Sequence, residues 1–483
     1  MKWFRILVFL LILAFSHRLQ AQTATVTWGT AHQTMDGFGG DTWLYQPTYS
    51  PSQLNLFFNP TSGIGYGIVR TDNGGCQINY SASACPVETS TMPQLSTVRN
   101  AVTDGAAVEL TIFPPANLKY SGNFSTTSIG ADGSCVDTSN FSALATFTVN
   151  WIEMMNANDA PVTYLFPFNE PNLNKSQLGA CQWGATGIDS YIKVLGPALS
   201  SAGLGSVKIG IADVSSWFNP DLVSACLNDS ACAQYVSIVS GHGYGTSGAP
   251  DGFTPQTGYC CNTASAAPSA AAGKHIWMNE VNGGHTYQNS YAFWTWDTSM
   301  SDALVWARNI HDYLTIANVS GYLYWELADC CYPGEGTGSF NDGLSLIDAA
   351  TVGARYYVIG NWSKFIRSGW VRIDTTSNPQ TGIYVTAFKD PTGTSYSIVA
   401  LNSNSSATSQ TFSFSGFPTT TSVTPYTTTS SDAGLVEQAS EAVSSSAFTY
   451  TLPAFSVTTF VGSTAAASNK EPTPPTGLTD TVR

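Results

Sequence analysis

Short apolar runs alternate with helix-like segments from about residue 36 to residue 350, and this alternation constrains the fold more than any other feature. The runs are continuous rather than interrupted by polar residues, which is typical of strands buried on both faces of a parallel sheet. Eight such strands separated by helices favour a (β/α)8 TIM barrel over an open doubly wound sheet. The expected strands are 35–40, 65–70, 107–113, 162–168, 207–212, 235–242, 274–278 and 321–327.

Two of the intervening segments carry clear helix signals. The segment 299–318 repeats apolar residues every three or four positions, and Ser299 at its start resembles a capping box with Asp302. The segment 188–203 has the same periodicity, but Pro197 within it predicts a kink or a break.

The composition changes after residue 369, where the chain becomes rich in Thr and Ser and alternates with a two-residue period. This pattern predicts an antiparallel β-sandwich fused to the barrel. The stretch ATVTWG at 24–29 has the same character and is expected to join the sandwich. The expected division is a signal peptide at 1–21, an N-terminal sandwich strand at 22–35, the catalytic barrel at 36–354, the sandwich at 355–462 and a Pro/Thr-rich, linker-like tail at 463–483.

Charged residues make up only 10% of the chain, well below the roughly 25% of a typical soluble domain. A surface rich in hydroxyl and aromatic groups suits neutral, polar partners, and sugars are the obvious case. The net charge of −14, without any cluster of Lys and Arg, argues against nucleic acids and anionic membranes as partners. We therefore expect a carbohydrate partner, such as a polysaccharide, and no nucleic-acid or membrane partner. We also expect a monomer, although the composition does not indicate the oligomeric state.

The N-terminus has the features of a secretory signal. Lys2 and Arg5 precede the apolar run 6–15, and Ala21 is a suitable cleavage point. We therefore expect a secreted, extracellular protein, because no later apolar run is long enough to span a membrane.

Ten cysteines in an exported chain favour disulfides over metal thiolates. We expect no metal and no cofactor, since neither CxxC nor HExxH occurs. The expected local disulfides are Cys226–Cys232 and Cys76–Cys85, and the doublets Cys260-Cys261 and Cys330-Cys331 could be cross-linked to each other.

Only two of the ten glutamates follow an asparagine, and each lies where an expected strand ends. Glu170 follows the fourth strand and Glu280 follows the seventh, so in a barrel their carboxyls would face each other across the mouth. Hydrolysis of a glycosidic bond needs two facing carboxyls. Either glutamate alone could be a solvent-facing residue, but the placement of both favours a catalytic pair.

The chain also contains a series of short motifs in a fixed order. They are QTMDGFGG (33–40), GIVRTD (67–72), FPPANLK (113–119), FNEPN (168–172), CQW (181–183), GHGY (241–244), WMNEVNGG (277–284) and YLYWEL (322–327). This is the order found in glycoside hydrolase family 30, which the chain resembles over roughly residues 24–462. The C-terminal part is similar to the side sandwich of the xylanase-like branch of that family.

This resemblance implies a retaining mechanism in which Glu170 is the acid/base and Glu280 the nucleophile. Asn169 would bind the hydroxyl next to the anomeric carbon. Arg70, at the end of the second strand, would lie beneath the nucleophile, and a purely structural ion pair is the alternative. The asparagine before Glu280 receives no role.

His242 and Tyr244, after the sixth strand, would orient the nucleophile and the sugar, although His242 could instead be a structural histidine. Trp325, at the end of the eighth strand, would form the floor on which a sugar ring stacks. Further tryptophans are candidates for the walls of the cleft, although each could instead belong to the core. These are Trp43, Trp183, Trp217, Trp294 and Trp296.

The substrate follows less directly. Relatives that depend on glucuronate carry an arginine in the loop after strand eight, whereas residues 328–343 contain no Arg or Lys and include Asp329, Glu335 and Asp342. The resemblance therefore implies an endo-β-1,4-xylanase without strict dependence on glucuronate. A β-1,6-galactanase or β-1,6-glucanase is the alternative enzyme. A non-catalytic carbohydrate-binding protein is the alternative from another class, and the presence of both glutamates argues against it. GHGYG does not match the GxSxG of serine hydrolases.

Overall fold

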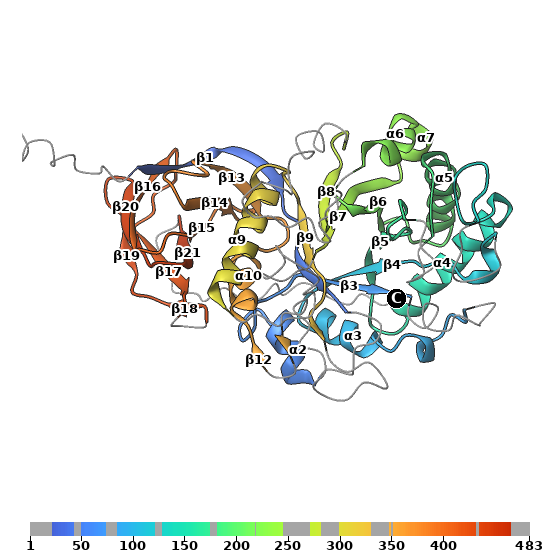
Figure 1. The fold of residues 1–483 in the computed structure, drawn as a ribbon, viewed down its shortest axis with the longest axis horizontal. Coiled ribbons are helices and arrows are strands. Elements are labelled where there is room, and N and C mark those ends of the chain that lie inside the picture. The colour runs from blue at the N-terminus through green and yellow to red at the C-terminus, as the bar shows by residue number, and fades with distance from the viewer. Residues whose placement is uncertain are drawn as a thin grey trace, which may run out of the picture.

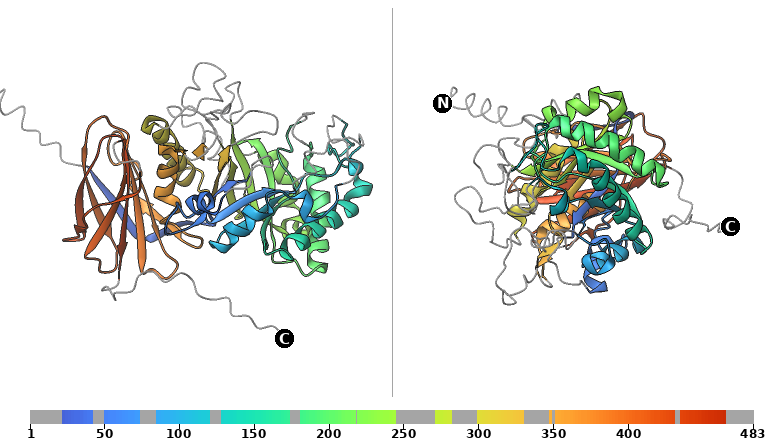
Figure 2. Two further views of the ribbon diagram at one scale, coloured as in Figure 1. Left: turned by 90° about the horizontal axis from the view of Figure 1, so that it is seen from below. Right: turned by 90° about the vertical axis from the view of Figure 1, so that its right-hand side faces the viewer.

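The computed structural model contains two bodies, a barrel and a strand-rich domain, at opposite ends of the molecule (Figures 1 and 2). The expected signal peptide at 1–21 and residues 465–483 of the expected tail lie outside the residues that the structure describes. The described residues are 22–42, 50–73, 85–120, 128–173, 181–217, 219–244, 271–281, 299–329, 347–348, 351–430 and 434–464.

Eight parallel strands form a closed barrel in sequence order, and the pairing of β2 with β9 closes it. Each expected barrel strand overlaps one observed strand, so the TIM-barrel prediction is confirmed. The strands are β2 (Gly37–Asp41), β3 (Ile68–Asp72), β4 (Ala107–Thr111), β5 (Val162–Phe166), β6 (Lys208–Ser216), β7 (Val236–Tyr244), β8 (His275–Glu280) and β9 (Gly321–Tyr324).

Large side chains fill the interior of the barrel, with Trp277 of β8 at their centre. Its ring lies 4.6 Å from that of Tyr164, centroid to centroid. A Cβ atom at Gly321 of the neighbouring β9 would lie 2.6 Å from the Trp277 ring, so this position requires glycine. The barrel is therefore a packed core, and a ligand can reach it only at its ends.

Helices surround the barrel. Ser299 caps α9 by accepting the N–H of Asp302, as its sequence suggested. Helix α5 continues through Pro197, so of the two outcomes expected there the break does not occur, and the kink stays a prediction. The helices are α2 (Pro51–Phe58), α3 (Leu95–Thr103), α4 (Phe141–Asn156), α5 (Ala185–Ser201), α6 (Pro220–Asn228), α7 (Ser230–Ala233), α9 (Met300–Thr315) and α10 (Ala354–Ser363), with the 3-10 turns η2 (Thr89–Thr91), η3 (Ala116–Leu118) and η4 (Thr138–Asn140).

The strand-rich domain is one largely antiparallel sheet that folds over on itself. Phe412 of β16 and Phe460 of β21 are far apart in the strand order, yet their ring centroids lie 5.1 Å apart. Side chains from the two ends of the sheet therefore share one core, which confirms the sandwich prediction. Its strands are β1 (Thr23–Thr34), β13 (Val371–Thr375), β14 (Ile383–Lys389), β15 (Ser395–Asn402), β16 (Thr408–Ser415), β17 (Ser422–Thr428), β18 (Val436–Glu437), β19 (Glu441–Ala442), β20 (Ala447–Leu452) and β21 (Ser456–Ser463).

Strand β1 lies between β13 and β16 in this sheet, antiparallel to the first and parallel to the second. Figure 1 shows it in blue among the orange and red strands from the C-terminal part of the chain. A separate three-stranded sheet contains β10 (Ala328–Asp329), β11 (Ile347–Asp348) and β12 (Thr351–Val352).

Helices α9 and α10 lie between the two bodies (Figure 1). Trp362 of α10 donates its indole N–H to Thr386 of β14 at 3.1 Å. Asn361 donates its amide N–H to Thr428 of β17 at 2.9 Å and accepts the hydroxyl of Thr459 at 2.9 Å. These buried bonds join the barrel firmly to the sandwich. Within the described residues, no helix has the length and apolar character needed to cross a membrane.

Candidate active site

Glu170 lies in the turn that follows β5. Its backbone has a φ of 48°, which is uncommon for a residue with a side chain. The turn is held in place because the N–H of Glu170 donates to the carbonyl of Asp213 at 2.8 Å. Strained backbone that the surrounding structure stabilises in this way is often found at functional sites.

Glu280 is the last residue of β8, and its side chain is 13% exposed while that of Glu170 is 19% exposed. One carboxylate oxygen of each residue and a ring nitrogen of His242 all lie within 4.8 Å of one another. The two glutamates from the ends of β5 and β8 are thus brought together at the mouth of the barrel.

Arg70 of β3 lies beneath this pair and is almost fully buried. Its Nη1 donates to Glu280 and, at 2.7 Å, to Asp41 at the end of β2. Its Nη2 donates to the Oδ1 of Asn169 at 2.8 Å, which orients that amide. The fork of a guanidinium suits this arrangement because it presents several N–H groups in fixed directions.

His242 of β7 is fully buried and lies among three carboxylates. Its Nδ1 lies 3.4 Å from Glu170 and 3.6 Å from Glu280, and its Nε2 lies 3.3 Å from Asp213. Burial alone would lower the pKa of His242, but the carboxylates of Glu280 and Asp213 raise it to about 10. The ring is therefore an imidazolium at neutral pH.

Three further carboxylates complete a buried network under the site. Burial raises the pKa of Asp41 to about 7 and that of Glu109 in β4 to about 8, against the opposing charge of Arg70. For Asp213 in β6 burial acts in the same direction, but the charge of His242 and its hydrogen bond hold the pKa below its usual value. Asp213 is thus the ionised partner of His242, whereas Asp41 and Glu109 hold a proton more readily.

Sequence reasoning missed Asp41, Glu109 and Asp213, and it gave Asn279 no role. The structure places Asn279 in full burial, donating from Nδ2 to Glu109 at 2.9 Å and to Asp213 at 3.0 Å. One signal was available, since Glu109 is a carboxylate within the apolar run AVELTIF. A charged residue inside such a strand needs a buried partner.

The aromatic residues expected to contact the sugar differ in their exposure, and some of them lie outside the described residues. Trp325 directly follows β9 and is partly exposed, and its backbone N–H donates to the carbonyl of Val281 after β8. Tyr244 is the last residue of β7, and its side chain is outside the described part of the structure. Three tryptophans also lie outside the described residues: Trp43, Trp294 and Trp296.

Trp183 and Trp217 do not line a cleft, which corrects the expectation for both. Trp183 is 1% exposed and stacks on Tyr191 of α5, and Trp217 is 6% exposed with its ring 4.8 Å from that of Tyr313 of α9. Both indoles pack into the hydrophobic layer between the barrel and its helices, so their faces are not available to a sugar.

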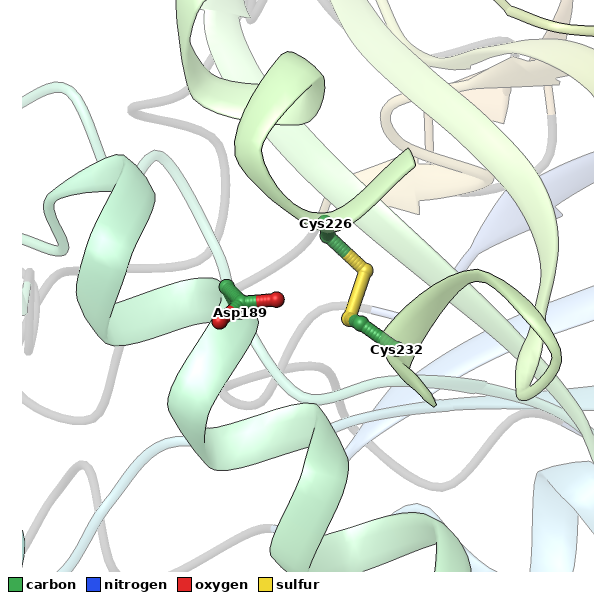
Figure 3. Close-up of side chains that lie close together, drawn as sticks. All are labelled: Asp189, Cys226 and Cys232. Carbon is green, nitrogen blue, oxygen red and sulfur yellow. A yellow bond between two sulfur atoms is a disulfide. The ribbon is translucent and has the colours of Figure 1, made fainter. Parts of the chain in front are cut away.

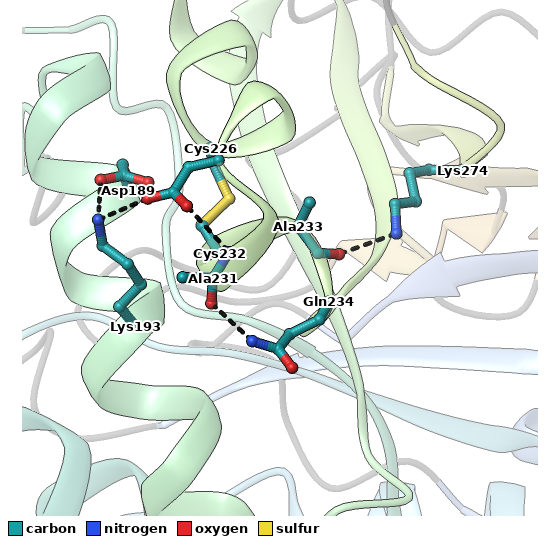
Figure 4. The surroundings of a disulfide bond; sticks show 9 residues. Asp189, Lys193, Cys226, Ala231, Cys232, Ala233, Gln234 and Lys274 are labelled. Atoms are coloured by element: carbon teal, nitrogen blue, oxygen red, sulfur yellow. Dashed lines mark hydrogen bonds and ion pairs between the residues drawn. A yellow bond between two sulfur atoms is a disulfide. The ribbon is translucent and has the colours of Figure 1, made fainter.

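The predicted disulfide Cys226–Cys232 joins α6 to α7. Asp189 of α5 points toward it (Figure 3), but sulfurs that are bonded to each other are not thiolate ligands, so these residues do not form a metal site. Asp189 instead pairs with Lys193 at 2.6 Å (Figure 4). Lys193 also donates to Asp229 at 2.8 Å.

A second disulfide, Cys135–Cys181, was not predicted. It connects segments that follow β4 and β5, and no local spacing marks it because its cysteines are 46 residues apart. Cys76 and both cysteine doublets lie outside the described residues, so the other expected pairings stay predictions.

A TIM barrel whose mouth holds two facing carboxylates is the framework of a glycoside hydrolase. Comparison with known families agrees with this class. Residues 95–333 match O-Glycosyl hydrolase family 30, and residues 369–460 match the Glycosyl hydrolase family 30 beta sandwich domain. The chain belongs to glycoside hydrolase family 30.

Individual relatives cover nearly the whole chain. The glucuronoxylanase XynC of Bacillus subtilis is 25% identical, over 91% of this chain and 92% of its own. The structure of Xyn30A, a subfamily 8 xylanase of this family from Clostridium acetobutylicum, is 27% identical with a TM-score of 0.72, over 92% of this chain and all of its own. A family 30 endoxylanase from Clostridium papyrosolvens shares the fold at 24% identity and a TM-score of 0.69, over 91% and 100% of the two chains.

Proposed function

We propose that this protein is a secreted, retaining endo-β-1,4-xylanase. The observation that carries the mechanism is the short distance between Glu170 and Glu280. A carboxylate oxygen of Glu170 lies within 4.8 Å of a carboxylate oxygen of Glu280. Retaining enzymes place the two carboxyl groups about 5–5.5 Å apart, whereas inverting enzymes need about 6.5–9.5 Å to admit a water molecule. The two xylanase relatives of 25% and 27% identity support the choice of substrate.

In this mechanism Glu280 attacks the anomeric carbon while Glu170 gives its proton to the leaving oxygen. The glycosidic C–O bond breaks and an ester between the sugar and Glu280 forms. Water then attacks the same carbon, Glu170 takes its proton, and the Glu280 carboxylate is released. Two buried cations support the site throughout, since Arg70 donates to Glu280 and the ring of His242 lies close to both carboxylates.

Asn169 is the residue we assign to the hydroxyl next to the anomeric carbon. Its Oδ1 already accepts from Arg70, so its Nδ2 is the group that would donate to the sugar. A hydrogen bond to this hydroxyl strengthens as the transition state forms. We assign Trp325 to stacking beneath the sugar and Tyr244 to contact with it.

We also propose that cleavage does not depend on glucuronate. Residues 328–343 contain acidic side chains but no Arg or Lys, so this loop supplies no cation to hold a glucuronate carboxylate. The protein should therefore cleave neutral arabinoxylan at a rate similar to that for glucuronoxylan. Products from these two xylans, together with arabinogalactan and a β-1,6-glucan, are compared by chromatography. Cleavage of only a β-1,6-linked glycan would replace the xylanase proposal.

The roles of the glutamates are tested separately. Glu170→Gln should lower kcat by about 10²–10⁴-fold, since it removes the proton donor. Glu280→Gln should abolish turnover, and the newly formed reducing end of wild-type products should have the β configuration in NMR spectra taken at early times. Glu153→Gln, on the exposed face of α4, is the matched control and should keep full activity. Full activity of either active-site variant would show that the assignment is wrong.

A further inference from the structure

Asn279 directly precedes the candidate nucleophile, but its side chain takes a different direction. Asn279 is completely buried, whereas the side chain of Glu280 is partly exposed at the mouth of the barrel. The amide of Asn279 lies between Glu109 of β4 and Asp213 of β6, with its Nδ2 at 2.9 Å and 3.0 Å from their carboxylate oxygens. Asn279 therefore contacts two buried acids and does not reach a substrate in the cleft.

The orientation of this amide is determined by its neighbours. A rotated amide would bring the carbonyl oxygen against Oδ1 of Asp213, which is ionised and would repel it. In the observed orientation Oδ1 accepts no hydrogen bond from any residue that the structure describes. Leaving an acceptor unsatisfied in the core is unfavourable for folding alone. We therefore attribute the presence of asparagine at position 279 to the two hydrogen bonds that it donates to Glu109 and Asp213.

The two acids that Asn279 contacts are those that hold the cations of the site. Glu109 lies 3.3 Å from Nε of Arg70, and Asp213 lies 3.3 Å from Nε2 of His242. The other sides of these cations contact the catalytic pair, because Arg70 donates to Glu280 and His242 lies 3.4 Å from Glu170. One amide is thus connected to each catalytic carboxylate through an acid and a cation.

We propose that Asn279 is a positioning residue for catalysis, which aligns Glu109 and Asp213 so that Arg70 and His242 are held against Glu280 and Glu170. This inference rests on the proposed function of the two glutamates. It extends that function because Asn279 itself touches neither the substrate nor the reacting atoms.

The sign of the effect on His242 follows from the groups that face it. They are Glu170 after β5, Asp213 of β6 and Glu280 of β8. Asp213 stays ionised without Asn279, because its pKa is held below the usual value. Without the N–H from Asn279, however, its carboxylate is no longer held at 3.3 Å from Nε2 of His242, and an imidazolium farther from its anion loses its proton more easily. The titration midpoint of His242 should therefore move to lower pH when the Asn279 amide is removed.

The test uses Asn279→Leu, which keeps the number and branching of the side-chain heavy atoms and removes the N–H donors. The titration of His242 is followed by NMR of histidine-labelled protein, with its signal assigned by its loss in His242→Gln. The expected result is a lower titration midpoint together with a fall in kcat on the order of 10- to 100-fold at unchanged KM, since small displacements at a reacting centre have effects of this size. Asn279→Ser keeps one donor, so its His242 titration midpoint and its kcat should lie between those of the wild type and those of Asn279→Leu.

The matched control is Asn361→Leu. Asn361 is also fully buried and also donates two hydrogen bonds, but it lies in α10 against the sandwich. The Asn361→Leu substitution should lower the melting temperature without changing the titration midpoint of His242 or kcat. The proposal is overturned if Asn279→Leu behaves like this control, or if only one of the two readouts changes. It is also overturned if neither Asn279 variant folds while Asn361→Leu does, because the role is then one of stability.

The two proposals fail in different ways. The NMR titration needs no substrate, so it tests the link from Asn279 to His242 whatever glycan the enzyme cleaves. If the wild type does not cleave xylan, the substrate proposal is wrong, and kcat is measured on the glycan that it does cleave.

Discussion

Asp213 and His242 are both fully buried, and their Oδ2 and Nε2 atoms lie 3.3 Å apart. The other ring nitrogen of His242, Nδ1, lies 3.4 Å from Glu170. The imidazolium therefore connects the buried Asp213 to Glu170, which is partly exposed. The two glutamates at the barrel mouth thus have a charged layer beneath them, which contains two cations and several carboxylates. Such a layer is costly to disturb, because removing one partner leaves the others buried without compensation.

Arg70 is the residue whose loss should be most damaging to this layer. We expect Arg70→Ala to lower the free energy of unfolding by about 3–5 kcal/mol, since it leaves buried carboxylates unpaired. Its contacts with Glu280 and Asn169 predict a large fall in kcat/KM as well. Urea unfolding and steady-state kinetics measure the two effects.

Arg99 provides the control for this substitution. It forms an ion pair with Asp159 in which both side chains are largely exposed. Arg99→Ala should therefore cost at most about 1 kcal/mol and leave kcat/KM unchanged. Equal effects of the two arginine substitutions would contradict the importance of the buried layer.

At the opposite end of the barrel, His275 of β8 lies 2.6 Å from Asp36, which also accepts the indole N–H of Trp277. The hydrogen bond with Asp36 raises the pKa of His275 above its usual value, although burial opposes the rise. A histidine whose pKa is raised by folding stabilises the folded state, and this contribution is fully present below about pH 6.5, the pKa of the unfolded state. The contribution is lost as the pH rises through the higher pKa of the folded state. Because the side chain is 43% exposed, we expect a contribution below about 1 kcal/mol.

His275→Gln should therefore reduce stability at pH 6 and have a smaller effect at pH 9. Unfolding by urea at both pH values measures the difference. An effect that grows with pH would contradict the assignment to His275.

Trp325 and Trp183 should respond differently to the same substitution. Trp325→Ala removes an aromatic face next to the candidate site, and we expect KM to rise about tenfold, which corresponds to about 1.4 kcal/mol. Trp183→Ala creates a cavity in the core and should cost about 3–5 kcal/mol of stability while leaving KM of the folded enzyme unchanged. Kinetics and thermal unfolding distinguish these outcomes, and a rise in KM for Trp183→Ala alone would reverse the two assignments.

The two observed disulfides should contribute unequally to stability. Cys226–Cys232 spans 6 residues and Cys135–Cys181 spans 46. Loop-closure entropy predicts a loss of about 2 kcal/mol for the double alanine variant of the first and about 4 kcal/mol for that of the second. Urea unfolding of both variants tests this order, and the reverse order would show that the loop length is not decisive.

The barrel could be predicted from the sequence because its strands are buried on both sides and therefore form unbroken apolar runs. The run that ends at Met278, for example, placed Glu280 at the mouth. The turn FNEPN likewise placed Glu170 beyond β5 without any knowledge of its backbone.

The buried network could not be predicted in the same way. Strand β6 changes its register with β7 between Ala212 and Val214, and both Ala212 and Asp213 have positive φ values. At such a bulge the alternation of side chains breaks down, so sequence spacing does not tell which face Asp213 occupies. The burial of Trp183 was equally hidden, since it depends on contact with Phe168 and with Tyr191 of α5.

Strand β1 has a consequence for how the protein is made. Thr25 receives its partner Thr376 only after 351 further residues have been synthesised. The ribosome therefore releases the barrel sequence while the first strand of the sandwich still lacks both neighbours, β13 and β16. Domains generally fold in the order of synthesis, but here the domain that is begun first is completed last. Throughout that interval, the growing chain carries an unpaired strand that is open to the wrong partners.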